Sequence, residues 1–232
     1  MPCQKPTQGR RHQRGPAARV PQGWHHGSVT EQRLTSRRVC IIGDELAAGF
    51  GDPRALGWVG RVIARSGAAS LLVTSLAVPG ETTTMLGSRW ESEVSRRLVG
   101  AGEDEAYLVI VLGTHDLIAG TSLARSRLNL ANLLDRAASM RLATFVVGPP
   151  PRNDLDGTAQ QELSAAFADV CQRRRVPYVE TYQPLALHAQ WQGDLAAGDG
   201  VHPGQAGHGL LAWLVLHHGW HEWLGVPGDP DA

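Results

Sequence analysis

Five apolar runs recur along the chain, and segments with helical spacing separate them. The runs are five to eight residues long and rich in Val, Ile and Leu, which is typical of strands buried on both faces. Strands that alternate with helices predict a parallel sheet with helices on both sides. We expect strands at 39–43, 71–78, 107–113, 143–150 and 177–181. We expect helices at 57–67, 84–99, 123–140 and 158–174, and a last helix that begins after Pro203-Gly204 and runs to about Leu224.

Polar, glycine-containing segments follow the first three strands, and another precedes the last helix. The three are GDEL from Gly43, AVPGET from Ala77 and LGTHD from Leu112. The fourth is GDGVHPGQAGH, from Gly198 to His208. Ligands of open parallel sheets bind at the carboxyl ends of the strands, so we expect these segments to meet there.

The four segments resemble the four blocks of the SGNH/GDSL hydrolase family, in the same order and over about residues 38–224. The last block is the most specific, because Asp, two residues, His, Pro and a glycine-rich helix start occur together. The resemblance implies an α/β fold, a three-layer α/β/α sandwich with a flavodoxin-like five-stranded parallel sheet. It also implies a hydrolase.

The resemblance assigns roles to five positions of this sequence. Asp199 and His202 match the family's Asp and His, which orient and supply the base, and Gly80 matches the glycine whose N–H helps to form the oxyanion hole. The first block of the family reads Gly-Asp-Ser-Leu, with Ser as nucleophile, and here that position is Glu45. The third block carries an oxyanion Asn, and here that position is His115.

A carboxylate at position 45 changes the chemistry. The serine mechanism needs a hydroxyl that loses its proton to His, and Glu45 has none. Its predicted place at a helix N-terminus beside His202 favours the anion. Glu45 would either fill the space of the acyl carbonyl or form an ion pair with His202. Another hydroxyl, of Thr114 or Thr82, is the alternative nucleophile.

Three uses of the site stay open. In the first, Glu45, His202, Asp199 and His115 form a catalytic group that hydrolyses a small ester or a strained ring, or performs acid/base chemistry such as cyclisation on a small organic substrate, for instance a secondary metabolite. Attack of the carboxylate on an sp³ carbon, as in an epoxide, is better chemistry than attack on an ester. In the second, the protein is an inactive pseudoenzyme that binds a ligand or partner. In the third, Glu45, His115 and His202 hold a metal.

Other residues of the blocks have supporting interpretations. Asp44 is expected to cap the turn, and we group it with Gly80 and Thr114 in the oxyanion or substrate-binding region. Trp191, before Asp199, is either a wall of the substrate pocket or a packing residue. Asp116 is a turn or cap residue that could also orient His115.

Composition sets the remaining expectations. Residues 1–38 contain eight of the 22 basic and one of the 22 acidic residues, so we expect a basic disordered tail at 1–37. An SGNH-hydrolase-like domain is expected at 38–226 and a short tail at 227–232. Three scattered cysteines predict neither a disulfide framework nor a metal cluster. We expect a cytoplasmic protein with a small-molecule substrate, no cofactor, and no nucleic-acid or membrane partner.

Overall fold

The computed structural model describes residues 37–67 and 70–227. The predicted tails therefore lie outside the described residues, except at their inner boundaries. Within these residues a five-stranded parallel sheet has the order β2-β1-β3-β4-β5. The strands are β1 (Arg37–Gly43), β2 (Leu71–Ala77), β3 (Ala106–Val111), β4 (Ala143–Val147) and β5 (Tyr178–Val179).

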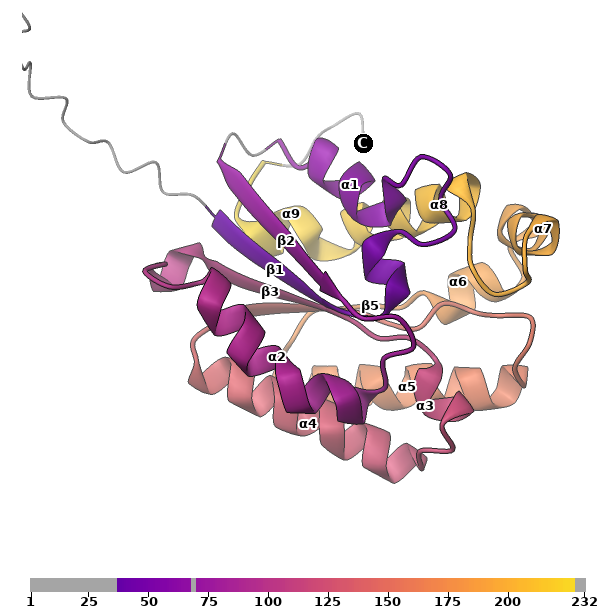
Figure 1. Cartoon of the computed structure of the whole chain (residues 1–232), viewed down its shortest axis with the longest axis horizontal. Helices are drawn as coiled ribbons and strands as arrows, with labels where there is room; N and C mark the ends of the chain where they lie inside the picture. The colour runs from indigo at the N-terminus through magenta and orange to yellow at the C-terminus, as the bar shows by residue number, and fades with distance from the viewer. Residues whose placement is uncertain (1–36, 68–69, 228–232) are drawn as a thin grey trace, which may run out of the picture. The chain divides into compact units, whose positions relative to one another are not determined.

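Helices connect the strands and cover both faces of the sheet (Figure 1). The α-helices are α1 (Gly57–Ala64), α2 (Thr83–Arg97), α3 (His115–Ile118), α4 (Leu123–Ser139), α5 (Gly157–Arg174), α6 (Tyr182–Ala186), α7 (Ala189–Ala197), α8 (Gln205–Val215) and α9 (His221–Leu224). Short helical turns are η1 (Glu45–Ala48), η2 (Glu103–Glu105) and η3 (Leu216–Trp220). None of the described helices is both long enough and apolar enough to cross a membrane.

Two apolar cores lie on opposite faces of the sheet. One contains Ile41 and Val109 with residues of α1 and α6 to α9, and the other contains Ile42 and Ile110 with residues of α2, α4 and α5. Alternate residues of each strand thus face alternate cores, as the pleat requires. Burial on both faces explains why the strands are apolar along their whole length. The predicted three-layer α/β/α sandwich is confirmed.

Side-chain caps fix where three of the predicted helices begin. Thr82, Ser122 and Asp156 accept hydrogen bonds from backbone N–H groups in the first turns of α2, α4 and α5. A cap of this kind satisfies an N–H that the helix itself leaves without a partner. The helix starts predicted from the sequence agree with these positions to within one residue.

The structure corrects the predicted elements in three places. The helix predicted to run to Leu224 is interrupted, because His218 and Gly219 leave helical geometry and Gly219 has φ +89°. The fourth strand ends at Val147 rather than at residue 150, since the prolines that follow have no N–H for a ladder. The short helices α3, α6 and α7 were not predicted.

Candidate active site

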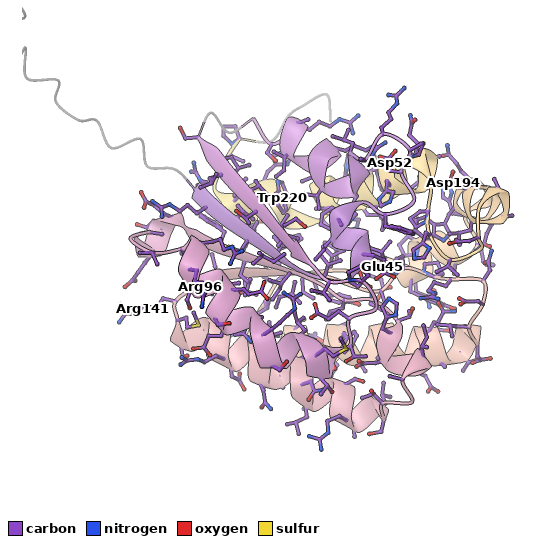
Figure 2. All side chains as sticks on the ribbon, viewed as in Figure 1. Glu45, Asp52, Arg96, Arg141, Asp194 and Trp220 are labelled. Carbon is purple, nitrogen blue, oxygen red and sulfur yellow. The ribbon has the colours of Figure 1, made fainter. Side chains whose placement is uncertain are left out.

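The four sequence blocks meet at the carboxyl edge of the sheet, where Figure 2 places Glu45. Glu45 begins η1 directly beyond β1, Gly80 follows β2, and His115 begins α3 beyond β3. Asp199 and His202 lie in the loop between α7 and α8. The strand ends therefore bring Gly80 and His115 into contact with Glu45, and the loop between α7 and α8 adds His202, 157 positions away.

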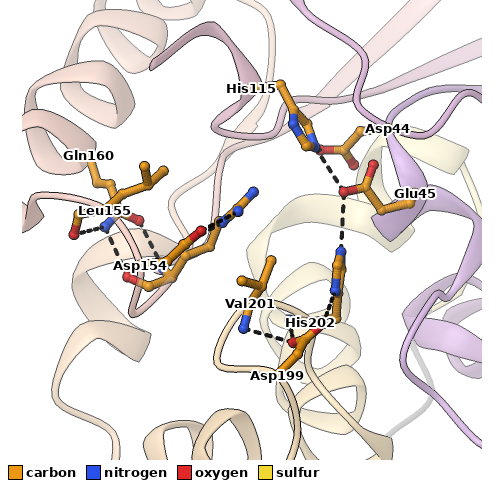
Figure 3. Close-up of polar contacts among 10 residues, drawn as sticks. Asp44, Glu45, His115, Asp154, Leu155, Gln160, Asp199, Val201 and His202 are labelled. Carbon is orange, nitrogen blue, oxygen red and sulfur yellow. Dashed lines mark hydrogen bonds and ion pairs between the residues drawn. The ribbon is translucent and has the colours of Figure 1, made fainter. Parts of the chain in front are cut away.

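Glu45 points inward and accepts three hydrogen bonds. Its Oε2 accepts from the backbone N–H of Gly80 at 2.8 Å. Its Oε1 faces the Nε2 atoms of both His115, at 2.8 Å, and His202, at 3.3 Å (Figure 3). The carboxylate thus takes the N–H that the resemblance assigns to the oxyanion hole and lies between two imidazoles.

These contacts keep Glu45 ionised. Burial acts to raise the pKa of Glu45, but hydrogen bonds from His115 and Gly80 outweigh it and lower the pKa from 4.5 to about 2. The hydrogen bond to Glu45 raises the pKa of His115, against the opposing effect of partial burial. Glu45 is therefore a carboxylate at neutral pH, and it favours the protonated form of His115.

Asp199 lies on the far side of the His202 ring. Its Oδ2 is 2.6 Å from His202 Nδ1, and its Oδ1 accepts from the backbone N–H groups of Val201 and His202. Hydrogen bonds from the His202 backbone and ring hold the pKa of Asp199 well below its usual range. Since both ring nitrogens of His202 face carboxylate oxygens, both contacts are hydrogen bonds only when both nitrogens carry hydrogen.

Asp44 fixes the turn that carries Glu45. It is buried, caps η1 by accepting from Leu46 N–H at 3.1 Å, and has its second oxygen 3.7 Å from His115 Nε2. Burial first, and then the neighbouring Glu45 charge, raise the pKa of Asp44 to about 7. Only glycine fits at position 113 beside it, because a Cβ there would lie 1.7 Å from Asp44 Oδ2. Asp44 thus has the capping role that the sequence predicted.

A cavity of about 10 Å³, the size of one water molecule, lies among these side chains. Thr114 lines it, and the buried Oγ1 of Thr114 has no hydrogen-bond partner among the described residues. A buried hydroxyl without a partner is unusual in proteins. Glu45, His115 and His202 line the same cavity.

The structure decides between the alternative interpretations of two residues. Trp191 is wholly buried in α7 and donates from its indole N–H to the carbonyl of Pro151 at 3.1 Å, so it is a core residue and not a wall of the pocket. Asp116 binds the N–H and hydroxyl of Thr83 at the start of α2, at 2.8 and 2.7 Å, so it caps that helix rather than orienting His115.

The predicted metal set is also corrected. The residues whose ligand atoms lie within 4.8 Å of one another are Asp44, Glu45 and His115, without His202. The reason is that the carboxylate of Glu45 stands between the two imidazoles and keeps them apart (Figure 3).

Sequence reasoning missed Arg152 and Phe50. Arg152, beyond β4, lines the cavity, and the ring of Phe50 packs edge-on against His202 with 4.6 Å between centroids. No motif marks either residue. The only available signal for Arg152 was its place shortly after a predicted strand, at the edge where the other blocks converge.

Comparisons with solved structures agree with this architecture. The lipase/acylhydrolase from Enterococcus faecalis is 24% identical, with a TM-score of 0.62 over 77% of this chain and 93% of that one. The psychrotrophic esterase EstA from Pseudoalteromonas sp., in a structure inhibited by monoethylphosphonate, is 18% identical, with a TM-score of 0.64 over 82% and 100%. An acetylxylan esterase from Geobacillus stearothermophilus is 19% identical, with a TM-score of 0.63 over 83% and 97%.

At these identities the structural matches establish the fold. No curated protein matches the sequence. A family match covers residues 41–210, which include all four blocks, and it supports a hydrolase-type function. The chain belongs to the GDSL-like lipase/acylhydrolase family.

Proposed function

We propose that the protein is a hydrolase of strained cyclic ethers such as epoxides, with Glu45 as the nucleophile. The proposal rests on one observation: the two carboxylate oxygens of Glu45 have different partners. Gly80 N–H holds Oε2, while His115 and His202 both face Oε1. An anion fixed in this way has one oxygen ready to attack and the other already in an oxyanion hole.

The first step forms an ester. Oε1 of Glu45 attacks a ring carbon of the epoxide, and the carbon–oxygen bond of the ring breaks. The ring oxygen takes the proton from Nε2 of His202, which leaves a neutral imidazole oriented by Asp199. A carboxylate with a pKa of about 2 is a weak base but is always charged, which suits nucleophilic attack better than proton abstraction.

The second step hydrolyses the ester. The neutral His202 takes a proton from a water molecule, which attacks Cδ of Glu45, and the negative charge that develops on Oε2 is held by Gly80 N–H. The bond between Cδ and Oε1 then breaks, and Oε1 leaves with the product and takes the proton from His202. The carboxyl proton of Glu45 returns to His202. One epoxide and one water thus give one diol, and the resting charges are restored.

Two neighbours support this cycle. The Nε2–H of His115, 2.8 Å from Oε1, stabilises the oxygen that leaves with the diol. The unpartnered hydroxyl of Thr114 suits the attacking water, since the cavity beside it has room for one molecule. The side chains of His115 and His202 keep 13% and 20% of their surface exposed, so a substrate can approach Oε1 from solvent.

Replacing His202 by Gln tests the proposal, because the ester would form with His115 as the remaining donor but would not be hydrolysed. Mass spectrometry of His202→Gln after incubation with an epoxide panel is expected to show the mass of one epoxide added at Glu45. The double variant Glu45→Gln/His202→Gln is the matched control and is expected to stay unmodified. An adduct on another residue, or equal labelling of both variants, would refute a carboxylate nucleophile.

The same contacts support a second candidate, a ligand-binding protein without catalysis. Gly80 N–H and both imidazoles already have an acceptor in Glu45, so these donors are occupied before any substrate arrives. In that case no epoxide of the panel would modify His202→Gln, and the wild type would produce no diol.

A further inference from the structure

Arg152 is the one cation other than the histidines that lines the Glu45 cavity, within the part of the chain that the structure describes. It follows β4 in the segment Pro149 to Arg152. Its guanidinium binds Asp154 side-on, from Nε to Oδ1 at 2.9 Å and from Nη2 to Oδ2 at 2.7 Å. The side chain of Arg152 is only 12% exposed, whereas that of Asp154 is 44% exposed.

The side-on pair leaves half of the guanidinium unused. A guanidinium has five N–H groups, and contacts through Nε and Nη2 occupy two of them. One hydrogen of Nη1 and the second hydrogen of Nη2 form another fork at the end of the group. Among the described residues no acceptor is bonded to Nη1. Nη1 is also absent from the buried side-chain atoms that lack a partner, so part of its surface is accessible. The end-on fork is therefore open to a ligand.

The backbone around Arg152 is held at three successive residues. The buried indole of Trp191 donates to Pro151 O, and Asn153 N–H donates to Gly200 O at 3.0 Å. The buried amide of Gln160 contacts Arg152 twice, accepting from its N–H at 2.8 Å and donating to its carbonyl at 3.0 Å. Polar groups from two helices and the His202 loop thus fix the backbone of Arg152, and the ion pair with Asp154 holds its guanidinium. A cation held in place loses little entropy when it binds a ligand.

We propose that the end-on fork of Arg152 binds a carboxylate group of the substrate. The planar fork matches the two oxygens of a carboxylate, and an ion pair of this geometry is stronger than a neutral hydrogen bond. The substrate class is then a small acid that carries the strained ring, with the ring at Glu45 Oε1 and the carboxylate at Arg152. This inference rests on the proposed function for the ring, but the anion site can be tested without any reaction.

The test uses a pair of unreactive ligands that differ in charge, glycerate and its amide, and measures binding by ligand-observed NMR. We expect wild type to bind glycerate at least ~10-fold more tightly than the amide, as a charged hydrogen bond provides. Arg152→Met is expected to lose that preference and leave amide binding unchanged. Arg152→Lys, which keeps the charge without the fork, is expected to retain only part of it and serves if the Met variant does not fold.

The matched control is Arg174→Met. Arg174 makes the same side-on pair with Asp135, at 2.7 and 2.9 Å, near the carboxyl end of α5. We expect Arg174→Met to leave the binding of glycerate and of its amide unchanged. Equal binding of glycerate and its amide by wild type, or equal weakening of both by Arg152→Met, would overturn the anion site.

Turnover of glycidate and glycidamide, the corresponding epoxides, separates the two proposals. Preference for glycidate that Arg152→Met abolishes supports both. Arg152-dependent binding of glycerate without any turnover of glycidate would leave the anion site standing and remove the epoxide reaction. Turnover of both epoxides at equal rates, unchanged in Arg152→Met, would support the epoxide reaction and remove the anion site.

Discussion

Replacing Glu45 by Gln removes the charge from the centre of the site and is expected to lower stability in a pH-dependent way. The carboxylate of Glu45 has a pKa of about 2 in the folded protein and an ordinary value of 4.5. The difference, at 1.36 kcal/mol for each unit, corresponds to about 3 kcal/mol of stability. This is an upper value, since the Gln carbonyl still accepts one hydrogen bond.

The sign follows from the direction of the shift. A lowered pKa contributes stability that is fully present above about pH 4.5 and is lost as the pH falls through 2. The advantage of wild type over Glu45→Gln should therefore be about 2–3 kcal/mol at pH 6 and shrink to roughly 1 kcal/mol at pH 3. The raised pKa of His115 reports the same contact and adds nothing separate.

Urea unfolding at pH 6, 4 and 3 measures this difference, because changes shared by both proteins cancel. Glu162→Gln, at an exposed position of α5, is the control and should match wild type at each pH. A Glu45→Gln variant more stable than wild type at pH 6 would refute the reasoning. It would mean that burial of the charge destabilises the fold by more than its three hydrogen bonds stabilise it, as is common at functional sites.

Three further predictions concern activity. Glu45→Ser restores a hydroxyl beside His202 and Gly80 N–H, so hydrolysis of p-nitrophenyl acetate and labelling by a fluorophosphonate should appear; absence of both in a folded variant would show that the rest of the serine machinery is not intact. Thr114→Val removes the hydroxyl proposed to hold the water, so the Glu45 ester should accumulate in quenched samples while its formation rate is unchanged; equal slowing of both steps would contradict that role. The rate of ester formation should not fall between pH 5 and pH 4 in wild type, because the pKa of Glu45 is lowered, and His115→Asn should shift the acid limb toward 4.5; overlapping pH profiles would show that His115 does not hold the anion.

The sheet and the meeting of the four blocks followed from the sequence because both depend on local patterns. Apolar runs such as 107–113 can only be buried, and short polar segments after parallel strands must share one edge. The resemblance to the SGNH/GDSL family, rather than the strand pattern, placed Glu45 beside His202, where the structure has 3.3 Å between Oε1 and Nε2.

What the sequence could not supply depends on side chains from distant segments. Trp191 was ambiguous because an indole can line a pocket or fill a core, and its contact with Pro151 is 40 positions away. Arg152 has no motif, and its place is fixed by Gln160, Trp191 and Gly200, whose contacts exist only in the folded chain. The break at Gly219 was missed because a single glycine near a helix end does not predict the residue at which the helix ends.

The central claim, that a Glu45 oxygen attacks the substrate and leaves with it, has one direct measurement. A single turnover of glycidate by excess enzyme in ¹⁸O-labelled water, followed by mass spectrometry of the peptide that contains Glu45, reports where the label goes. The account predicts one ¹⁸O in the carboxyl group of Glu45 and an unlabelled diol. A labelled diol with an unlabelled Glu45 would mean that water attacks the ring directly, and it would contradict the account.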